Sequence, residues 1–404
     1  MSTSLLYHAF GIRGYQYLST RYQGGEIFVT IEPPRESFRC PACGSSQVHL
    51  DEWCPRRWKT VPIGAKTVWI EMDVPKVECQ SCGAKRRVEL GFAKPKRQYT
   101  HSFERYVTEL LQYLTPQDVS RHLGISWDMA NDIQKRRLGQ RFARPKLKRL
   151  THIAIEEIYL GKRHKSITIV LDLKSGAVVF VGDGKGSDAL KPFWKRLRSS
   201  GAKIQAVATD MSQAYISAVQ KNLPNARLVF DRFQVIKLLN EKLTELRRQL
   251  YREATDLLEK NVLNGIRWLL LKNPENLEGA KNERERLDAA LKLNHSLAAA
   301  YDLKDELRLF WEQENYHAAN RFLTDWCLRA EASGIKLLMK FANTLRSHRS
   351  GLLAWYSHPI STGPLEGTNN KIKLLQRRAY GYRDLELFKL RILSLHTTRF
   401  ELVG

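Results

Sequence analysis

The order of strand and helix patterns that begins at residue 151 constrains this chain more than any other feature of its sequence. Continuous or alternating apolar residues predict strands, whereas apolar residues spaced three or four apart predict helices. The order is three strands, helix, strand, helix, strand, helix, in the segments HIAIEEIYL, KSITIVLDL, AVVFVGD, SDALKPFWKRLR, KIQAVATD, SQAYISAVQKNL, ARLVFD and FQVIKLLNEKL. This alternation favours an α/β domain built around one sheet.

The same order is that of the ribonuclease-H-like fold, so we expect a core of that fold in two parts, residues 151–238 and 356–404. The residues between them, 239–355, follow a helical pattern almost throughout, which predicts an all-helical insertion. In this fold one acid lies on the first strand, one just after the fourth and one on a late helix. The matching acids here are Glu156, Asp210 and Glu366.

The segment from Gly363 to Arg383 combines the last of these acids with several cations, namely Lys371, Lys373, Arg377 and Arg378. A lone carboxylate backed by cations suits a site that holds a divalent metal against a phosphodiester. Three acids from distant segments could hold two Mg²⁺ or Mn²⁺ ions about 4 Å apart. Because such acids repel one another without metal, their cluster would imply a bound cation.

Each of the three acids also has a structural alternative. Glu366 follows a proline, where an acid stabilises the N-terminus of a helix. Asp210 precedes a helix that its side chain would cap, and Glu156 belongs to an EE pair that would be exposed. The joint arrangement, rather than any single acid, favours a metal site.

The charge balance points to a polyanionic partner. The 404 residues carry a formal net charge of +24, which favours binding to nucleic acid. The first residues, MSTSLLYHAFGIRG, lack the features of a secretory signal, and no apolar run reaches the ~18 residues of a membrane span. We expect a cytoplasmic, nucleoid-associated protein.

Residues 1–98 are expected to form a β-rich zinc ribbon, with strands in EIFVTIE, KTVWIEMDV and KVECQ. Two CxxCG sequences supply four thiolates, Cys40, Cys43, Cys79 and Cys82, and four thiolates give zinc a closed, structural shell. A redox CxxC pair or buried cysteines are the alternatives. Cys54 and His49 lie between the pairs and could replace one ligand, and Cys327 is expected in a core.

Residues 99–143 are predicted to form an all-α helix-turn-helix domain, followed by a basic linker at 144–150. Thr115 and Pro116 would begin the second helix, Gly124 would form the turn, and Ser126 would cap the third helix. That helix would lie in a DNA major groove and would present Trp127, Asn131, Gln134, Lys135, Arg136 and Arg137. A plain helical hairpin is the alternative.

Along nearly its whole length the chain resembles the ISL-three-type insertion-sequence transposases of the DDE class. The motifs that carry the resemblance are CPACG, CQSCG, IAIEEIYLGKRHKSITIVLDL, VATDMSQAY, NARLVFDRFQVIKLLN and GPLEGTNNKIKLLQRRAYGYRDLELFKLRIL. The resemblance implies catalytic acids at Glu156, Asp210 and Glu366. It departs from the family in two places: Glu156 stands where an Asp is usual, and Gln234 stands where a His is usual.

The extra methylene of Glu156 would displace its carboxylate by roughly an ångström, and such a misplacement can cost on the order of 100-fold in rate. Strand alternation predicts that Glu157 points to the other face, so it is not an easy substitute for Glu156. Asp172 and Asp231 are candidate supporting acids.

Several residues near the last acid are candidates for DNA contacts. Asn369, Asn370, Lys373 and Arg377 would share the Glu366 face of their helix and hold the DNA backbone. Arg378, Tyr380, Tyr382 and Arg383 could stack on an unpaired base, with ordinary packing as the alternative.

We therefore expect a DNA transposase that binds terminal inverted repeats, cuts them with Mg²⁺ or Mn²⁺, and joins the 3′ hydroxyl to target DNA as a homodimer. One alternative is a catalytically weakened, sequence-specific DNA-binding protein derived from a transposase, which Glu156 would explain. The other is a structure-selective nuclease on the same core.

Overall fold

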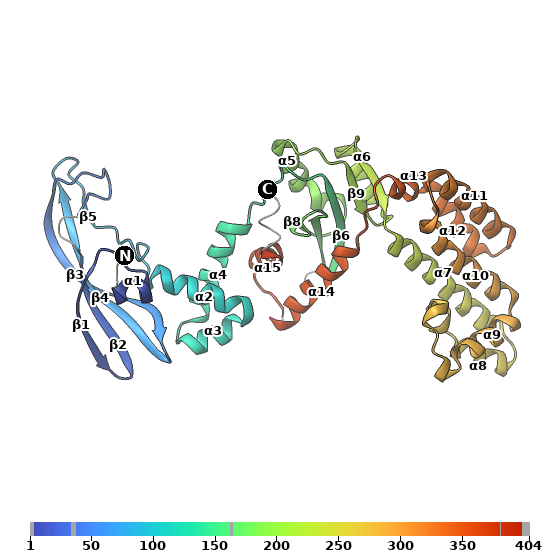
Figure 1. Ribbon diagram of the computed structural model, residues 1–404, viewed down its shortest axis with the longest axis horizontal. Helices are drawn as coiled ribbons and strands as arrows, with labels where there is room; N and C mark the ends of the chain where they lie inside the picture. Colours follow the sequence, from blue (N-terminus) through green and yellow to red (C-terminus); the bar gives the residue numbers. More distant parts are fainter. Residues whose placement is uncertain (1–3, 34–37, 162–164, 380, 398–404) are drawn as a thin grey trace. The chain divides into compact units, whose positions relative to one another are not determined.

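The computed structural model describes residues 4–33, 38–161, 165–379 and 381–397. The chain divides into two compact units, Met1–Arg141 and Phe142–Gly404, each of which contains a five-stranded sheet (Figure 1). Among the helices of the described residues, none is both long and apolar enough to cross a membrane.

The sheet of the first unit consists of β1 (Gln16–Gln23), β2 (Glu26–Glu32), β3 (Val48–Ile63), β4 (Lys66–Cys79) and β5 (Lys85–Arg87). Its order is β1-β2-β4-β3, with β5 also paired to β4. Every second residue of β4 from Val68 to Val74 is buried, and these residues pack with the short helix α1 (Leu5–Phe10) in one apolar core.

The two strands predicted from KTVWIEMDV and KVECQ are a single strand, β4, that continues through Pro75. Proline has no N–H to donate, but its φ is compatible with a strand. The pairing of β4 with β5 begins only at Lys76, so Pro75 is not required as a donor to that neighbour. The prediction of a break at this proline was therefore wrong.

Three helices complete the first unit: α2 (His101–Tyr113), α3 (Pro116–Leu123) and α4 (Trp127–Phe142). The signals at their ends are those predicted. Thr115 caps α3 and exchanges hydrogen bonds with Asp118 in a capping box. Gly124 adopts φ 56°, in the left-handed region, and Ser126 accepts a hydrogen bond from the amide of Met129.

The sheet of the second unit consists of β6 (His152–Gly161), β7 (Lys165–Asp172), β8 (Val178–Asp183), β9 (Ala206–Thr209) and β10 (Arg227–Phe230). Its order is β10-β9-β6-β7-β8. β6, β7 and β8 form an antiparallel meander, whereas β9 and β10 run parallel to β6. All five strands lie where the sequence predicted them.

Helices cover the faces of this sheet, which explains why its strands are apolar on both sides. The 3₁₀ turn η2 (Ser187–Leu190) leads into α5 (Lys191–Ser200), and α5 and α6 (Gln213–Asn222) share an apolar core with the sheet. Near the end of the chain, α14 (Gly363–Arg378) contacts β6 and α15 (Leu385–Leu393) contacts β8.

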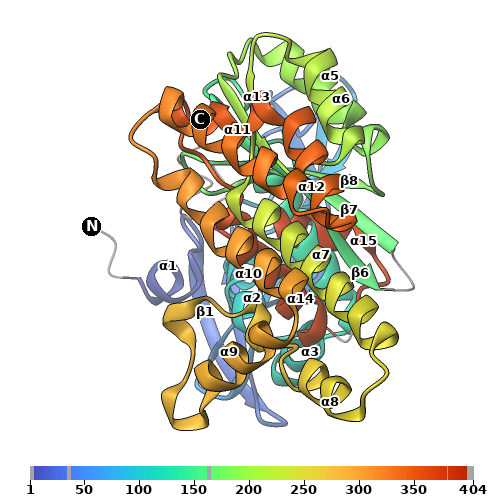
Figure 2. The same cartoon turned by 90° about the vertical axis from the view of Figure 1, so that its right-hand side faces the viewer.

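The remaining helices follow β10. The first, α7 (Arg232–Glu253), packs beside α10 (Figure 2) and runs without a break across residue 238, where the sequence predicted the boundary between the core and the helical insertion. The other helices are α8 (Leu257–Gly265), α9 (Glu283–Leu293), α10 (His295–Leu307), α11 (Tyr316–Ala332), α12 (Lys336–Ser347) and α13 (Arg349–Leu353), with 3₁₀ turns η3 (Leu269–Leu271), η4 (Pro274–Asn276), η5 (Gly279–Lys281), η6 (Arg308–Glu312) and η7 (Ala354–Tyr356). Cys327 lies in their common core, as predicted.

Candidate functional site

The four cysteines of the two CxxCG sequences meet at one point. Their sulfur atoms lie within 4.8 Å of one another, and the pairs Cys40–Cys82 and Cys43–Cys79 are separated by 3.7 and 3.5 Å. A tetrahedral zinc with Zn–S bonds of about 2.3 Å places its sulfurs roughly 3.8 Å apart, so this donor set fits the metal. His49 and Cys54 lie outside the cluster, on β3.

The predicted recognition helix, α4, divides into exposed and buried residues. Trp127 is 50% exposed, Lys135 is exposed, and Asn131 and Arg137 are half-buried. Gln134 is only 4% exposed, which removes its side chain from any surface that DNA could contact. The expectation of a DNA contact for Gln134 is corrected, because the residue faces the core.

Arg136 is likewise occupied within the protein. Its guanidinium donates to the buried Glu104 at 2.9 and 3.1 Å and to the Tyr99 hydroxyl at 2.7 Å. A further bond reaches Asp132 at 2.8 Å. Because Glu104 is 2% exposed and needs a cation, Arg136 is a structural residue of α4 rather than a free phosphate ligand. The expectation of a DNA contact is corrected here too.

One strand of the ribbon sheet holds the turn of the helix-turn-helix. The ammonium group of Lys59, on β3, donates to the carbonyl oxygens of Leu123 and Gly124 at 2.5 and 3.0 Å. The Lys59 backbone also bonds to Gln98 and Thr100. Lys59 was not a candidate from the sequence, since a lysine in a strand carries no signal that it will cap a distant helix.

Two of the three predicted acids lie in the same region of the sheet. Glu156 is on β6 and Asp210 follows the last residue of the neighbouring β9, and each lies two residues beyond the last paired residues, Ala154 and Ala208. Burial raises the pKa of Glu156, and the negative charges of Asp210 and Asp231 add to the effect. A hydrogen bond from Asn369 and the charge of Lys237 act against it. Glu156 therefore does not belong to an exposed EE pair.

Asp210 lies in the same electrostatic environment. Burial raises its pKa, the amide of Ser212 lowers it through a 3.1 Å hydrogen bond, and the charge of Glu157 raises it. Lys237 lowers it, as it does for Glu156. The N-cap of α6 is Ser212, so the alternative in which Asp210 caps that helix does not hold.

The helix that carries Glu366 is held against this region by three contacts. Thr362, its N-cap, donates to Asp231 at 2.5 Å, Asn369 bonds to Glu156, and Gln376 donates to the Leu160 carbonyl at 2.8 Å. Seven residues separate each contact from the next, which is two turns of α-helix, so one face of α14 follows β6 (Figure 1).

Glu366 is exposed and lies four residues after Thr362 and three before Asn369, which puts it on the face that contacts β6. Its carboxylate does not complete a tight cluster. In the part of the chain that the structure describes, only the four cysteines form a group of three or more metal-ligating side chains within 4.8 Å. The fold thus brings Glu156 and Asp210 to one region, whereas among the described residues Glu366 forms no hydrogen bond or ion pair with either acid.

The other candidate acids differ in their roles. Asp172 accepts from Lys174 and Ser175 in a turn, and it pairs with Ile153, at the far end of β6 from the acids. It is not a supporting acid. Asp231 is 2% exposed. Its negative charge raises the pKa of Glu156, and its carboxylate accepts the hydrogen bond from Thr362.

The charge of Glu157 acts on Asp210, although strand alternation places Glu157 on the opposite face of β6 from Glu156. It accepts a 2.6 Å hydrogen bond from Ser166, and its charge raises the pKa of Asp210. That Glu157 is not an easy substitute for Glu156 stays a prediction, because a charge acts across several ångströms from either face. Asp210 lies just beyond the end of β9, so it is not confined to one face of the sheet.

The four cations predicted on α14 are exposed, and so are Asn370 of the same helix and Arg383 beyond its end. The exposed set is Asn370, Lys371, Lys373, Arg377, Arg378 and Arg383. Tyr382 is instead 9% exposed and stacks on Phe388 with 4.5 Å between ring centroids, so it packs in the core and cannot receive a base. Tyr380 lies outside the described residues.

Family models match three successive parts of the chain. The zinc-finger of transposase IS204/IS1001/IS1096/IS1165 matches residues 36–82, the helix-turn-helix domain of transposase family ISL3 matches 88–138, and the transposase domain of that family matches 153–392. The chain belongs to the ISL3 family of DDE transposases. The last match runs from β6 into α15, so this transposase carries all three acids and the helical insertion inside the matched domain.

Two curated relatives align with this transposase over most of their length. The transposase for insertion sequence element IS1001 of Bordetella parapertussis is 31% identical over 372 residues, which cover 91% of each chain. The transposase for insertion sequence element IS1557 of Mycobacterium tuberculosis is 26% identical over 408 residues, covering 94% of this chain and 91% of the relative. The matched ribbon and its cysteine cluster support a structural zinc ion, and the matched helix-turn-helix supports DNA binding.

Proposed function

We propose that this transposase cuts the ends of its insertion sequence and joins them to target DNA, using Glu156, Asp210 and Glu366 in a ribonuclease-H-like core. The strand order β10-β9-β6-β7-β8, with an antiparallel meander followed by two parallel strands, supports that fold. The observation that carries the proposal is the convergence of Glu156, Asp210 and the α14 residue Asn369, which lie on three separate elements.

The donor set suits hard divalent cations. Half-buried carboxylates with raised pKa values hold protons at low pH and gain from a nearby cation when they ionise. Two bound Mg²⁺ or Mn²⁺ ions would activate an attacking oxygen and neutralise charge on the leaving oxygen. Asn369 would orient Glu156, and Asp231 would hold α14 through Thr362 so that Glu366 faces the same space.

DNA recognition is proposed for two surfaces, one in each unit. On α4, Trp127, Asn131, Lys135 and Arg137 would contact the terminal inverted repeat in its major groove. On α14, Asn370, Lys373, Arg377 and Arg378 would hold the phosphate backbone beside the acids. Because strand transfer joins two element ends, we propose that a homodimer acts on the DNA.

The proposal is tested with purified zinc-loaded protein, Mg²⁺ or Mn²⁺, and duplexes that carry the element's terminal sequence. We expect nicking and strand joining by the wild type. Asp210→Asn should abolish both reactions while binding to the duplex stays unchanged, because the change removes a metal ligand and leaves α4 intact. Equal cleavage by wild type and Asp210→Asn would contradict the assigned site.

A catalytically weakened DNA-binding protein is the second candidate, and Glu156 in place of an Asp is the observation that favours it. Glu156→Asp separates the two candidates, with Glu157→Asp as the matched control. If the longer side chain only misplaces the carboxylate, the substitution should raise cleavage by up to about 100-fold. No cleavage by either protein would favour the binding function, and cleavage that ignores the terminal sequence would favour a structure-selective nuclease.

A further inference from the structure

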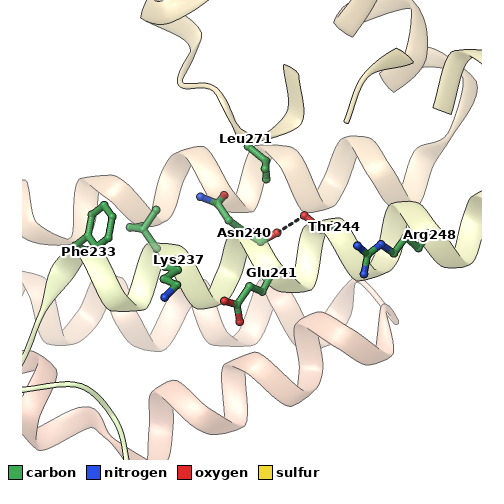
Figure 3. Close-up of a pocket in the computed structure, with 8 residues that line it drawn as sticks. Phe233, Lys237, Asn240, Glu241, Thr244, Arg248 and Leu271 are labelled. Atoms are coloured by element: carbon green, nitrogen blue, oxygen red, sulfur yellow. Dashed lines mark hydrogen bonds between the residues drawn. The ribbon is translucent and has the colours of Figure 1, made fainter. Parts of the chain in front are cut away.

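A groove of about 430 Å³ follows α7 directly after that helix leaves the sheet (Figure 3). Phe233, Lys237, Asn240 and Arg248 line it from α7, and Leu271 closes it from the other side. The α7 positions are separated by four, three and eight residues, which aligns them along one stripe of the helix. The groove is therefore a continuous strip rather than an isolated pocket.

One residue of this groove is linked electrostatically to the acids. Lys237 lines the groove, and its positive charge lowers the pKa values of both Glu156 and Asp210. Asp231, at the N-cap position of α7, raises the pKa of Glu156 and accepts a hydrogen bond from Thr362. Lys237 therefore belongs both to the groove and to the electrostatic environment of the acids.

The groove offers the contacts that a nucleic acid strand requires. Lys237 and Arg248 are exposed, and among the described residues neither forms an ion pair with a carboxylate within 4 Å. Glu241 is the acid in the lining, so the two cations leave a net positive charge. Phe233 is 57% exposed, and the side-chain oxygen of Asn240 is buried without a hydrogen-bond partner.

We propose that this groove binds a single strand of DNA as it leaves the acids, an inference that rests on the proposed function. Lys237 and Arg248 hold phosphates, Phe233 stacks on a base, and Asn240 accepts a hydrogen bond from a base or sugar. Eleven residues separate the two cations, or about 16 Å along the helix, so they would contact different phosphates of one strand. A volume of about 430 Å³ is in the ~300–1,000 Å³ range of small-ligand pockets, which is too small for a duplex.

The test compares binding of full-length, zinc-loaded protein to two end-containing duplexes, one blunt and one with a single-stranded tail, without Mg²⁺. Arg248→Gln should weaken binding to the tailed duplex and lower its salt slope by about 0.7, the value for one phosphate contact of a single strand. Phe233→Ala should weaken the same binding about tenfold through lost stacking. Binding to the blunt duplex should not change for either variant.

Lys242→Gln is the matched control, because it removes a cation from α7 that pairs with Glu245 at 3.2 Å and does not line the groove. It should bind both duplexes as the wild type does. The inference would be overturned if Arg248→Gln and Phe233→Ala bound the tailed duplex as tightly as the wild type does. It would also be overturned if each variant lost the same affinity for the tailed and the blunt duplex. Because no cleavage is measured, a protein that never cuts but still shows these losses would refute the proposed function and support the groove.

Discussion

Thr362 donates a 2.5 Å hydrogen bond to Asp231, although 131 residues separate them in the sequence. Both residues are buried, and each occupies the N-cap position of a helix, Thr362 before α14 and Asp231 before α7, although their side chains bond to each other rather than to their helices. This bond fixes where α14 begins relative to the sheet. It therefore fixes the placement of Glu366, which lies in the first turn of α14.

Thr362→Val is expected to reduce cleavage far more than DNA binding. The change leaves the buried Asp231 carboxylate without its donor and should destabilise the protein by about 1–3 kcal/mol. A shift of α14 by about 1 Å should lower the cleavage rate by roughly 100-fold. Ser361→Ala, which alters the neighbouring hydroxyl, is the control for thermal unfolding and gel-based cleavage. Similar rates for the two variants would argue against a positioning role.

The metal-free acids make the effect of Mg²⁺ on stability dependent on pH. Burial raises the pKa values of Glu156 and Asp210 above their ordinary 4.5 and 3.8, so the folded protein holds protons that the unfolded chain releases. Stability should fall as pH rises from these ordinary values through the raised ones. Mg²⁺ bound as proposed by the ionised acids would offset this loss.

Thermal unfolding with and without Mg²⁺ at pH 5 and pH 8 checks this prediction. We expect the metal to raise the Tm more at pH 8, because protons compete with it at pH 5. Asp210→Asn should shrink the difference. An equal shift at both pH values, unchanged in Asp210→Asn, would place Mg²⁺ elsewhere on the protein.

Arg136 and Arg137 are adjacent on α4 but should respond to substitution in opposite ways. Arg136→Met leaves Glu104 buried without its main cation, so the first unit should lose about 3 kcal/mol of stability. Arg137→Gln should leave the Tm unchanged, weaken binding to the terminal duplex and lower the salt slope by about one. Titrations at several salt concentrations, together with thermal unfolding, distinguish the two. Reversed outcomes would mean that α4 presents its other side to DNA.

Removing zinc should unfold the ribbon and abolish DNA binding. In zinc-finger peptides the metal contributes about 10–16 kcal/mol at pH 7. Because strand β4 ends at the zinc ligand Cys79, we expect the folding of the ribbon sheet to depend on the metal. Cys79→Ser should lose the bound zinc, whereas Cys54→Ser, outside the cluster, should keep one zinc per chain. Elemental analysis and unfolding curves measure both effects. Full zinc content in Cys79→Ser would contradict the four-cysteine site.

The local signals of this sequence were sufficient for most elements and for the ends of α3 and α4, but not for the unbroken strand β4. The capping residues Thr115 and Ser126, the left-handed Gly124 and the paired cysteines act within a few residues of themselves, so their roles can be inferred from spacing alone. The strands of the second sheet were equally clear, because burial on both faces leaves continuous apolar runs.

Only the tertiary structure decided which of these side chains meet. The pairing of β6 with β9 brings Glu156 and Asp210 into one region, the packing of α4 buries Gln134, and the ion pair with Glu104 occupies Arg136. The bond between Thr362 and Asp231 has no signature in either segment. Periodicity and capping residues depend on interactions between residues that are close in the sequence. Contacts between residues more than fifty positions apart depend on how whole helices and strands pack, and no short sequence pattern encodes that packing.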